Sequence, residues 1–199
     1  MSSGAPDDPR WMGRFASPGR PEEPLRLLFI GHNPSQAAWT SGHYYANPSN
    51  RFWSLLELSG IIARETRTPA DWELPAAAGI GFCDLGRVSG NDSSLFTRAV
   101  LRVWRDDLFE RLAGHAGRAG AGPQVVAFTG KRQWKVLFEP QLPRCEHGEQ
   151  PSGLRPQGWP LPDSGVWVLP STSGRAAMSN RQRSLPYYEL ARFMRLAGI

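Results

Sequence analysis

The feature that constrains this chain most is a short apolar run that ends abruptly in a polar turn. Leu27 to Ile30 are all apolar, which is typical of a buried strand, and the run stops at Gly31-His32-Asn33-Pro34-Ser35. The arrangement recurs late in the chain, where Val166 to Leu169 runs into a turn of small polar residues at 170–175. In an open α/β sheet, ligands bind just beyond the carboxyl ends of the strands. The two turns are therefore natural places for chemistry.

Apolar runs alternate with helical patterns along the whole chain. Buried strands are expected at 25–30, 79–85, 124–129 and 166–169. Helices are expected at 50–59, 95–112, about 131–138 and about 185–196. The second of these is the strongest, with an apolar side formed by Leu95, Val100, Leu101, Trp104, Leu108 and Leu112. The alternation predicts a three-layer α/β/α fold with a mostly parallel, doubly wound central sheet.

The chain divides into a tail and one domain. Residues 1–24 are rich in Pro, Gly, Ser, Asp and Arg, which predicts a flexible N-terminal tail. Residues 25–199 are long enough for a single domain with a sizeable core. Within it, 31–50 is expected to be a long loop, and a loop of that length in a compact domain is usually functional. Residues 113–123 are expected to form a Gly/Ala turn, and 139–164 an extended Pro- and Gly-rich insertion.

The charge of the chain suits an anionic partner. The formal net charge is +5 and the sequence pI about 9.8, and Lys131 and Lys135 are the only lysines. Arginine is weakly hydrated and forks onto phosphates, so this balance fits a nucleic acid. A high-GC genome that prefers Arg codons explains the same composition, so composition alone does not decide between the two.

The cysteine content argues against disulfides and metal. Cys83 and Cys145 are too few for a disulfide framework and indicate a reducing cytosol. Cys145 and His147 form a C-x-H pair without a second pair at metal spacing, so we expect no metal and no cofactor. No run approaches the length of a transmembrane helix, and the first residues lack an apolar signal core. The expectation is a soluble cytoplasmic protein, associated with the nucleoid if the host is bacterial.

Three motifs in a fixed order carry a family resemblance. They are Gly31-His32-Asn33-Pro34-Ser35, then Gly42-His43-Tyr44-Tyr45-Ala46-Asn47-Pro48 with Asn50-Arg51-Phe52-Trp53, then Ser171-Thr172-Ser173-Gly174-Arg175. Together they resemble the mismatch-specific uracil-DNA and thymine-DNA glycosylase family over roughly residues 25–198. The resemblance implies a monomeric enzyme that flips uracil, in the first place uracil opposite guanine, out of double-stranded DNA. It then hydrolyses the N-glycosidic bond and leaves an abasic site.

The resemblance also implies roles for particular residues. Asn33 matches the catalytic asparagine of the family, whose amide holds the attacking water. Tyr45 is expected to stack on the flipped pyrimidine, and the rest of the base pocket to comprise Gly31, His32, Ser171 and Ser173. Arg175 falls where the family inserts a side chain into the duplex, and the other expected DNA contacts are Gly174, Ala176 and Arg181.

A neutral amide is a modest catalyst, so a nearby carboxylate is of interest. Asp84 and Asp92 bracket the tail of the second predicted strand. A carboxylate there can orient or deprotonate the water and stabilise positive charge on the sugar. The family often has a neutral or basic side chain where Asp84 falls, and Asp92 also fits an N-cap before a helix, so both catalytic roles are hypotheses. Lys131 and Lys135 are expected in a helix away from the motif turns, which fits monofunctional chemistry.

Other readings of the sequence stay open. One is a glycosylase with another main target base, such as thymine or an exocyclic adduct. Another is a non-catalytic module that recognises mismatches without cutting. A nucleotide-binding α/β protein unrelated to DNA is disfavoured because the chain lacks G-x-G-x-x-G and G-x-x-x-x-G-K-[ST]. Among the histidines outside the motifs, His115 and His147 are expected to face solvent.

Overall fold

Five strands form one sheet in the order β2-β1-β3-β5-β4. The computed structural model describes residues 24–63, 71–174 and 176–199, so the expected tail at 1–24 lies outside the described residues except for its last residue. The strands are β1 (Leu27–Gly31), β2 (Ile80–Asp84), β3 (Val125–Phe128), β4 (Gly148–Glu149) and β5 (Gly165–Val168). Every pairing is parallel except that of β4 with β5. The predicted mostly parallel α/β sheet is confirmed.

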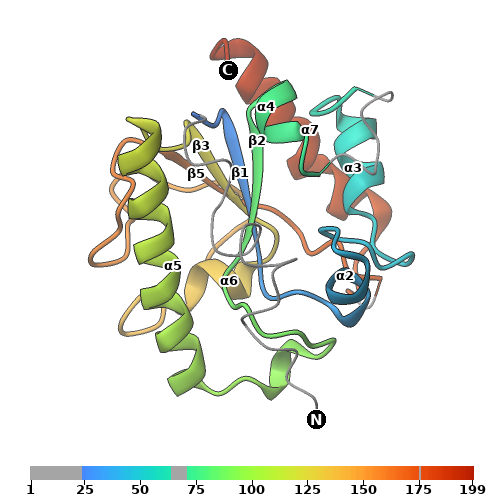
Figure 1. Cartoon of the computed structure of the whole chain (residues 1–199). Coiled ribbons are helices and arrows are strands. Elements are labelled where there is room, and N and C mark those ends of the chain that lie inside the picture. Colours follow the sequence, from blue (N-terminus) through green and yellow to red (C-terminus); the bar gives the residue numbers. More distant parts are fainter. Residues whose placement is uncertain (1–23, 64–70, 175) are drawn as a thin grey trace.

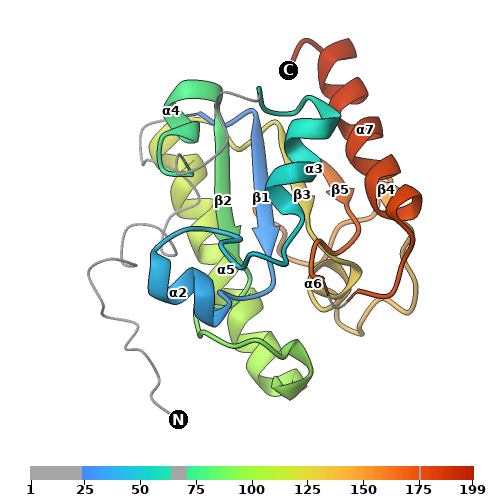
Figure 2. The same cartoon turned by 90° about the vertical axis from the view of Figure 1, so that its right-hand side faces the viewer.

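The strands are apolar throughout because both faces of the sheet are covered. Successive side chains of β1 alternate, so Leu27 and Phe29 enter one core cluster while Leu28 and Ile30 enter the other. The helices α3 (Phe52–Ser59) and α7 (Asn180–Leu196) cover the first face, and α5 (Arg98–Ala119) covers the second (Figures 1 and 2). The molecule therefore has the three layers that the sequence pattern predicts.

Four shorter helical segments complete the described part of the chain. They are α2 (Gln36–Ser41), α4 (Leu74–Ala78), the single 3₁₀ turn η2 (Ser93–Leu95) and α6 (Lys131–Lys135). The prediction of an uninterrupted loop at 31–50 is wrong, because α2 lies within it. This helix is capped by the Ser35 hydroxyl, which accepts a hydrogen bond from the Ala38 amide, and it ends at Gly42 in the left-handed conformation. Six residues are too few to show a helical period in the sequence.

The boundaries of the longest helix differ from the prediction at both ends. The Thr97 side chain caps α5, so Leu95 lies outside it in η2 and is 76 % exposed. The helix then continues into the expected turn at 113–123 as far as Ala119 and is capped by Gly120, which is left-handed. Because of this extra length, His115 lies on the core side of α5 and is fully buried, so the prediction that it faces solvent is wrong.

The C-terminal helix also begins earlier than predicted. A capping box between Ser179 and Gln182 starts α7, so Arg181 lies in its first turn. That turn is polar and lacks the apolar period that marks the rest of the helix, which explains why the sequence pattern missed it. The expected insertion at 139–164 contains β4, which pairs with the edge of the sheet. Among the described residues, no helix is long and apolar enough to cross a membrane.

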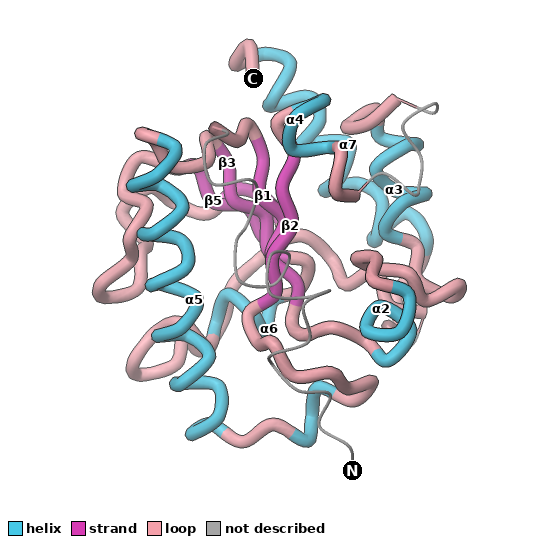
Figure 3. Tube along the Cα trace, in the orientation of Figure 1, coloured by secondary structure: helices cyan, strands magenta, loops and turns pink. Residues whose placement is uncertain are grey.

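The parallel strands all end at one edge of the sheet. Figure 2 shows β1 and β2 running toward α2 and the segment that precedes α5, and Figure 3 shows loops gathered at this end. The register places Gly31, the last residue of β1, directly beside Asp84, the last residue of β2. The turns that follow β1, β2, β3 and β5 therefore meet at this carboxyl edge.

Candidate active site

A cavity of about 450 Å³ opens at the carboxyl edge of the sheet. Its wall comes from segments that lie far apart in the chain: 31–35, 38, 44–45, 47, 49–50, 84, 90–91, 93, 129–133 and 171–174. The predicted site residues that line it are Gly31, His32, Asn33, Tyr45, Asp84, Ser171, Ser173 and Gly174. Asp92, Ala176 and Arg181 are not among the lining residues, and Arg175 lies outside the described residues.

The Asp84 carboxyl is the buried acid of this cavity. The residue is 5 % exposed, and burial raises the pKa of its carboxyl to about 7, against a smaller opposing effect of the Arg111 guanidinium. A carboxyl that ionises near neutral pH is suited to accept a proton from water. The structure thus brings this acid into the same cavity as the Asn33 turn.

Gly31 is glycine because the Asp84 carboxylate occupies the space of a side chain. A Cβ at this position would lie 2.0 Å from Asp84 Oδ1 and 3.2 Å from the Tyr45 hydroxyl oxygen. No residue with a Cβ fits there unless the carboxylate moves. The glycine of the first motif therefore permits the close approach of the acid and the tyrosine to the end of β1.

The Asn33 amide is engaged in the protein itself. Its Nδ2 donates hydrogen bonds to the backbone carbonyls of Val88 and Gly90, both at 3.0 Å, which ties the turn after β1 to the segment after β2. Its Oδ1 is 2.8 Å from His32 Nδ1. Because the amide N–H groups are used in this way, Asn33 can bind a water only through the remaining lone pair of Oδ1.

The His32 imidazole is neutral and orients the Asn33 amide. Burial lowers the pKa of its imidazole, and the nearby Arg132 adds to that effect, while the bond to Asn33 opposes it. An amide oxygen can only accept, so His32 Nδ1 donates the proton in this contact. The ring packs against Phe96 and Trp104, with centroids 5.9 and 5.8 Å away. His32 is thus a rigid donor that fixes the direction of Asn33 Oδ1.

Tyr45 forms an aromatic wall of the cavity. Its backbone has φ of 54°, a left-handed conformation that is rare for a non-glycine residue and is often found at functional sites. One face of the ring stacks on Phe52 at a centroid distance of 3.7 Å and an interplanar angle of 15°. The hydroxyl is 3.2 Å from Thr129 Oγ1. These contacts hold the ring in one orientation.

The turn at 170–174 and the following Ala176 are anchored from two helices. The Arg51 amide, at the start of α3, donates to the Thr172 carbonyl at 3.0 Å. From α7, the Tyr187 hydroxyl donates to the Pro170 carbonyl at 3.1 Å and the Arg183 guanidinium to the Ala176 carbonyl at 2.7 Å. The small residues of the third motif are therefore held at the cavity, while Arg181 is exposed on α7.

Asp92 is the N-cap residue of η2. Its Oδ1 accepts hydrogen bonds from the Ser94 amide at 2.9 Å and the Ser94 hydroxyl at 2.6 Å. The residue is exposed, and it caps the 3₁₀ turn rather than the long helix. The capping role that the sequence suggested for Asp92 is the one that these contacts describe.

The sequence interpretation missed the turn after β3. Lys131 lines the cavity, so the prediction that it lies away from the motif turns is wrong. Its Nζ is 3.2 Å from a Glu146 carboxylate oxygen, whereas Lys135 donates to the Pro143 carbonyl and does not line the cavity. The signal was available, because 124–129 was expected to be a strand parallel to 25–30 and must then end at the same edge.

A comparison with protein families agrees with this fold. The model of the uracil DNA glycosylase superfamily matches residues 18–193. The chain belongs to the uracil DNA glycosylase superfamily. Members of this superfamily are DNA glycosylases, hydrolases of base excision repair that act on damaged bases in DNA. Membership rules out the alternative of a nucleotide-binding protein unrelated to DNA.

The superfamily assignment makes the cavity at the carboxyl edge the candidate pocket for an extruded nucleotide. A glycosylase must receive an extruded nucleotide in a pocket, because the bond it cleaves is inaccessible inside the duplex. In the described ranges, no group of three His, Cys, Asp or Glu side chains is placed to hold a metal ion. Among the polar groups at this cavity are the Asp84 carboxyl and the Asn33 amide oxygen, which can act on a water.

Proposed function

We propose that this glycosylase removes uracil mispaired with guanine from double-stranded DNA and belongs to the mismatch-specific and thymine-DNA branch of its superfamily. The observation that carries the proposal is the convergence of Asn33, Tyr45, Asp84 and the turn at 171–174 on one cavity. These groups come from four separate parts of the chain, and they supply a water ligand, an aromatic platform, an acid and a polar rim.

In the proposed reaction, Asn33 Oδ1 and the Asp84 carboxylate hold a water beside C1′ of the flipped nucleotide. As the bond from C1′ to the base nitrogen breaks, the base leaves as an anion and the sugar gains positive charge. The carboxylate stabilises that charge and accepts a proton as the water oxygen bonds to C1′. The products are a free base, which takes up a proton, and an abasic site.

Asn33 cannot supply the base that accepts the proton of the water in this reaction. An asparagine whose N–H groups are bound to Val88 and Gly90 can position a water but cannot remove its proton. Asp84, with a pKa near 7, can do so at neutral pH. We therefore assign orientation of the water to Asn33 and proton acceptance to Asp84.

Tyr45 is the proposed platform for the base, which leads to a prediction about its ring. Replacing Tyr45 with Ala removes the stacking surface and should lower single-turnover excision from a G·U duplex by about 5- to 150-fold, corresponding to the ~1–3 kcal/mol typical of base stacking. Tyr45→Phe keeps the ring on Phe52 and loses only the Thr129 contact, so it should retain most of the rate. If Tyr45→Ala excises uracil at the wild-type rate, the ring takes no part in base recognition.

We further propose that the enzyme is monofunctional, and that it acts as a monomer in the cytoplasm. A bifunctional enzyme needs an uncharged amine that attacks C1′. Lys131 is the lysine at the cavity, and its ammonium is paired with the Glu146 carboxylate. To attack C1′, Lys131 would first have to leave this ion pair.

A panel of labelled substrates tests the proposal directly. Duplexes with G·U, G·T and A·U pairs and a single strand containing uracil are incubated with the enzyme and then treated with alkali. We expect cleavage at uracil in G·U above all, and no strand break before alkali. Borohydride should trap no covalent complex with DNA, and trapping that disappears in Lys131→Ala would overturn the monofunctional assignment. Cleavage of G·T or an adduct in preference to G·U would overturn the choice of uracil.

A further inference from the structure

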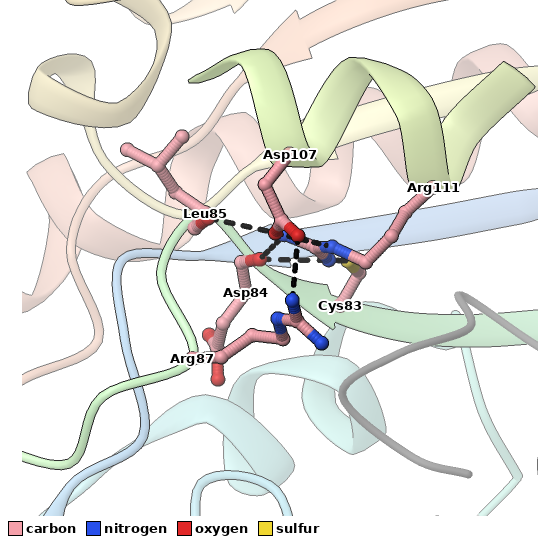
Figure 4. Close-up of polar contacts among 6 residues, drawn as sticks. All are labelled: Cys83, Asp84, Leu85, Arg87, Asp107 and Arg111. Carbon is pink, nitrogen blue, oxygen red and sulfur yellow. Dashed lines mark hydrogen bonds and ion pairs between the residues drawn. The ribbon is translucent and has the colours of Figure 1, made fainter. Parts of the chain in front are cut away.

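Behind the cavity, a buried guanidinium holds the end of β2. Arg111 on α5 has a side chain only 7 % exposed, and its fork points at the strand end that carries Asp84 (Figure 4). Its Nη2 donates to the carbonyls of Asp84, at 2.9 Å, and Leu85, at 3.1 Å. Its Nη1 contacts the Cys83 sulfur. One side chain thus contacts Cys83, Asp84 and Leu85, three consecutive residues centred on the proposed proton acceptor.

The same guanidinium has a counterion on its own helix. Arg111 Nε donates to Asp107 Oδ2 at 2.8 Å, and the other oxygen of Asp107 accepts from Arg87 at 2.7 Å (Figure 4). The Asp107 side chain is 28 % exposed, so the negative charge lies nearer to solvent than the Arg111 cation. The field of the guanidinium at Asp84 is therefore only partly cancelled.

Stability alone does not account for this cluster. A buried ion pair costs much of its attraction in lost hydration, and an apolar side chain of similar volume often serves as well in a core. The neighbours of Arg111 on the same face, Leu108 and Leu112, are fully buried apolar residues. The placement of a cation among these apolar residues, in contact with the backbone of Asp84, therefore indicates a role at the candidate active site.

We propose that Arg111 is a positioning residue for the Asp84 carboxyl, holding the end of β2 in place and favouring the carboxylate by its charge, with Asp107 moderating that charge. The proposal rests on the proposed function of Asp84 as the proton acceptor. It assigns to α5 a part in the reaction through residues that do not line the cavity.

The other ionisable groups around Asp84 leave Arg111 as its main charged neighbour. Burial raises the pKa of the Cys83 thiol and of the Tyr44 and Tyr45 hydroxyls, so all three are neutral where the Asp84 carboxyl titrates. Burial also keeps the His32 imidazole neutral by lowering its pKa. Lys131 and Arg132 contribute positive charge from the cavity wall at α6.

Two substitutions should shift the pH dependence in opposite directions. Arg111→Met removes the favourable charge, so the midpoint of the single-turnover rate against pH should rise by about one unit or more. Asp107→Asn leaves the guanidinium groups of Arg111 and Arg87 without their shared carboxylate, so the midpoint should fall by a few tenths of a unit. Damage to packing would lower the rate at every pH without shifting the midpoints in opposite directions.

Matched controls lie on the same helix. Arg102 pairs with Glu139 and Asp106 with Arg105 at exposed positions, so Arg102→Met and Asp106→Asn should keep the wild-type midpoint. If Arg111→Met does not fold, Arg111→Lys keeps the charge and loses the fork. It should then keep the midpoint within a few tenths of a unit and lower the rate. Unchanged midpoints in both Arg111→Met and Asp107→Asn, or shifts of the same sign, overturn the proposal.

A second measurement separates this inference from the proposed function. The Asp84 carboxyl carbon can be titrated by ¹³C NMR in the free wild-type protein, Arg111→Met and Asp107→Asn, with Asp84→Asn to assign the signal. Opposite shifts of that titration support the inference even if Asp84→Asn excises uracil normally, in which case the proposed role of Asp84 as proton acceptor fails. A titration that is the same in all three proteins overturns the inference even if Asp84 proves essential.

Discussion

Replacing Asp84 with Asn is expected to lower the single-turnover excision rate on a G·U duplex by about 10²- to 10⁴-fold, the usual contribution of a general base. The amide has nearly the same size and shape as the carboxyl, so the cavity should keep its form and affinity for the duplex should change little. Asn cannot accept the proton of the water or offset positive charge on the sugar. The loss should therefore appear in the chemical step, measured with enzyme in excess over DNA.

The dependence of the excision rate on pH should show that the ionised form of Asp84 is the active one. The wild-type rate should rise through a midpoint near 7 as Asp84 ionises, and the residual rate of Asp84→Asn should lack that rise. Asp92→Asn is the matched comparison, because Asn also caps helical turns and residue 92 is not part of the cavity wall. It should keep both the rate and the profile. A wild-type rate in Asp84→Asn would leave Asn33 as the sole water ligand.

The same substitution should change stability in a pH-dependent way. The Asp84 pKa lies near 7 in the folded protein and near 3.8 in the unfolded chain, so the folded state loses stability as pH rises between these values. Asp84→Asn has no such ionisation. Its melting temperature relative to wild type should therefore increase from pH 4 to pH 7 and level off above, as differential scanning calorimetry can measure.

Gly31→Ala is expected to lower the excision rate by about 10²-fold or more without unfolding the protein. The new methyl group would lie 2.0 Å from Asp84 Oδ1, so the carboxylate must move away from the end of β1. A displacement of about 1 Å at a reacting group commonly costs a factor of this size. The substitution tests where the carboxylate sits, whereas Asp84→Asn tests what it does.

Gly117→Ala is the control for this substitution. Gly117 lies in α5, and a Cβ there meets no other atom within 4 Å. It should keep the wild-type rate and stabilise the helix by about 0.5–1 kcal/mol. If Gly31→Ala excises uracil at the wild-type rate, the carboxylate is not needed at its observed place. Combining Gly31→Ala with Asp84→Asn should give little further loss, because both disable the same group.

The secondary structure was largely predictable because its signals are local. A run such as 27–30 must be buried on both faces, and a run ending in Gly-x-Asn-Pro must stop there, so the strands and their ends follow from the chain itself. The sequence fails to predict helical segments that are too short or too polar to show an apolar period. The helix α2 has only six residues, and the first turn of α7 is marked by a capping box rather than by apolar spacing.

The residues of the candidate site were likewise predictable only in part from the sequence. The motifs indicate Asn33, Tyr45 and the turn at 171–174, since each follows or precedes an element that the pattern already predicts. They cannot tell a catalytic Asp84 from a catalytic Asp92, because two acids after one strand look alike in a sequence. The difference is burial: the register of β1 with β2 buries Asp84 against Gly31, while Asp92 turns outward to cap η2.

The linear chain thus determined the main strands and long helices, and where the strands end, because propensity and apolar period act over a few residues. Only the tertiary structure decided that the guanidinium of Arg111 reaches the backbone of Asp84 and that the N–H groups of Asn33 are bound to backbone carbonyls. Arg111 lies 27 residues beyond Asp84, and Val88 lies 55 residues beyond Asn33. Contacts over such separations depend on strand order and register, which no local signal carries.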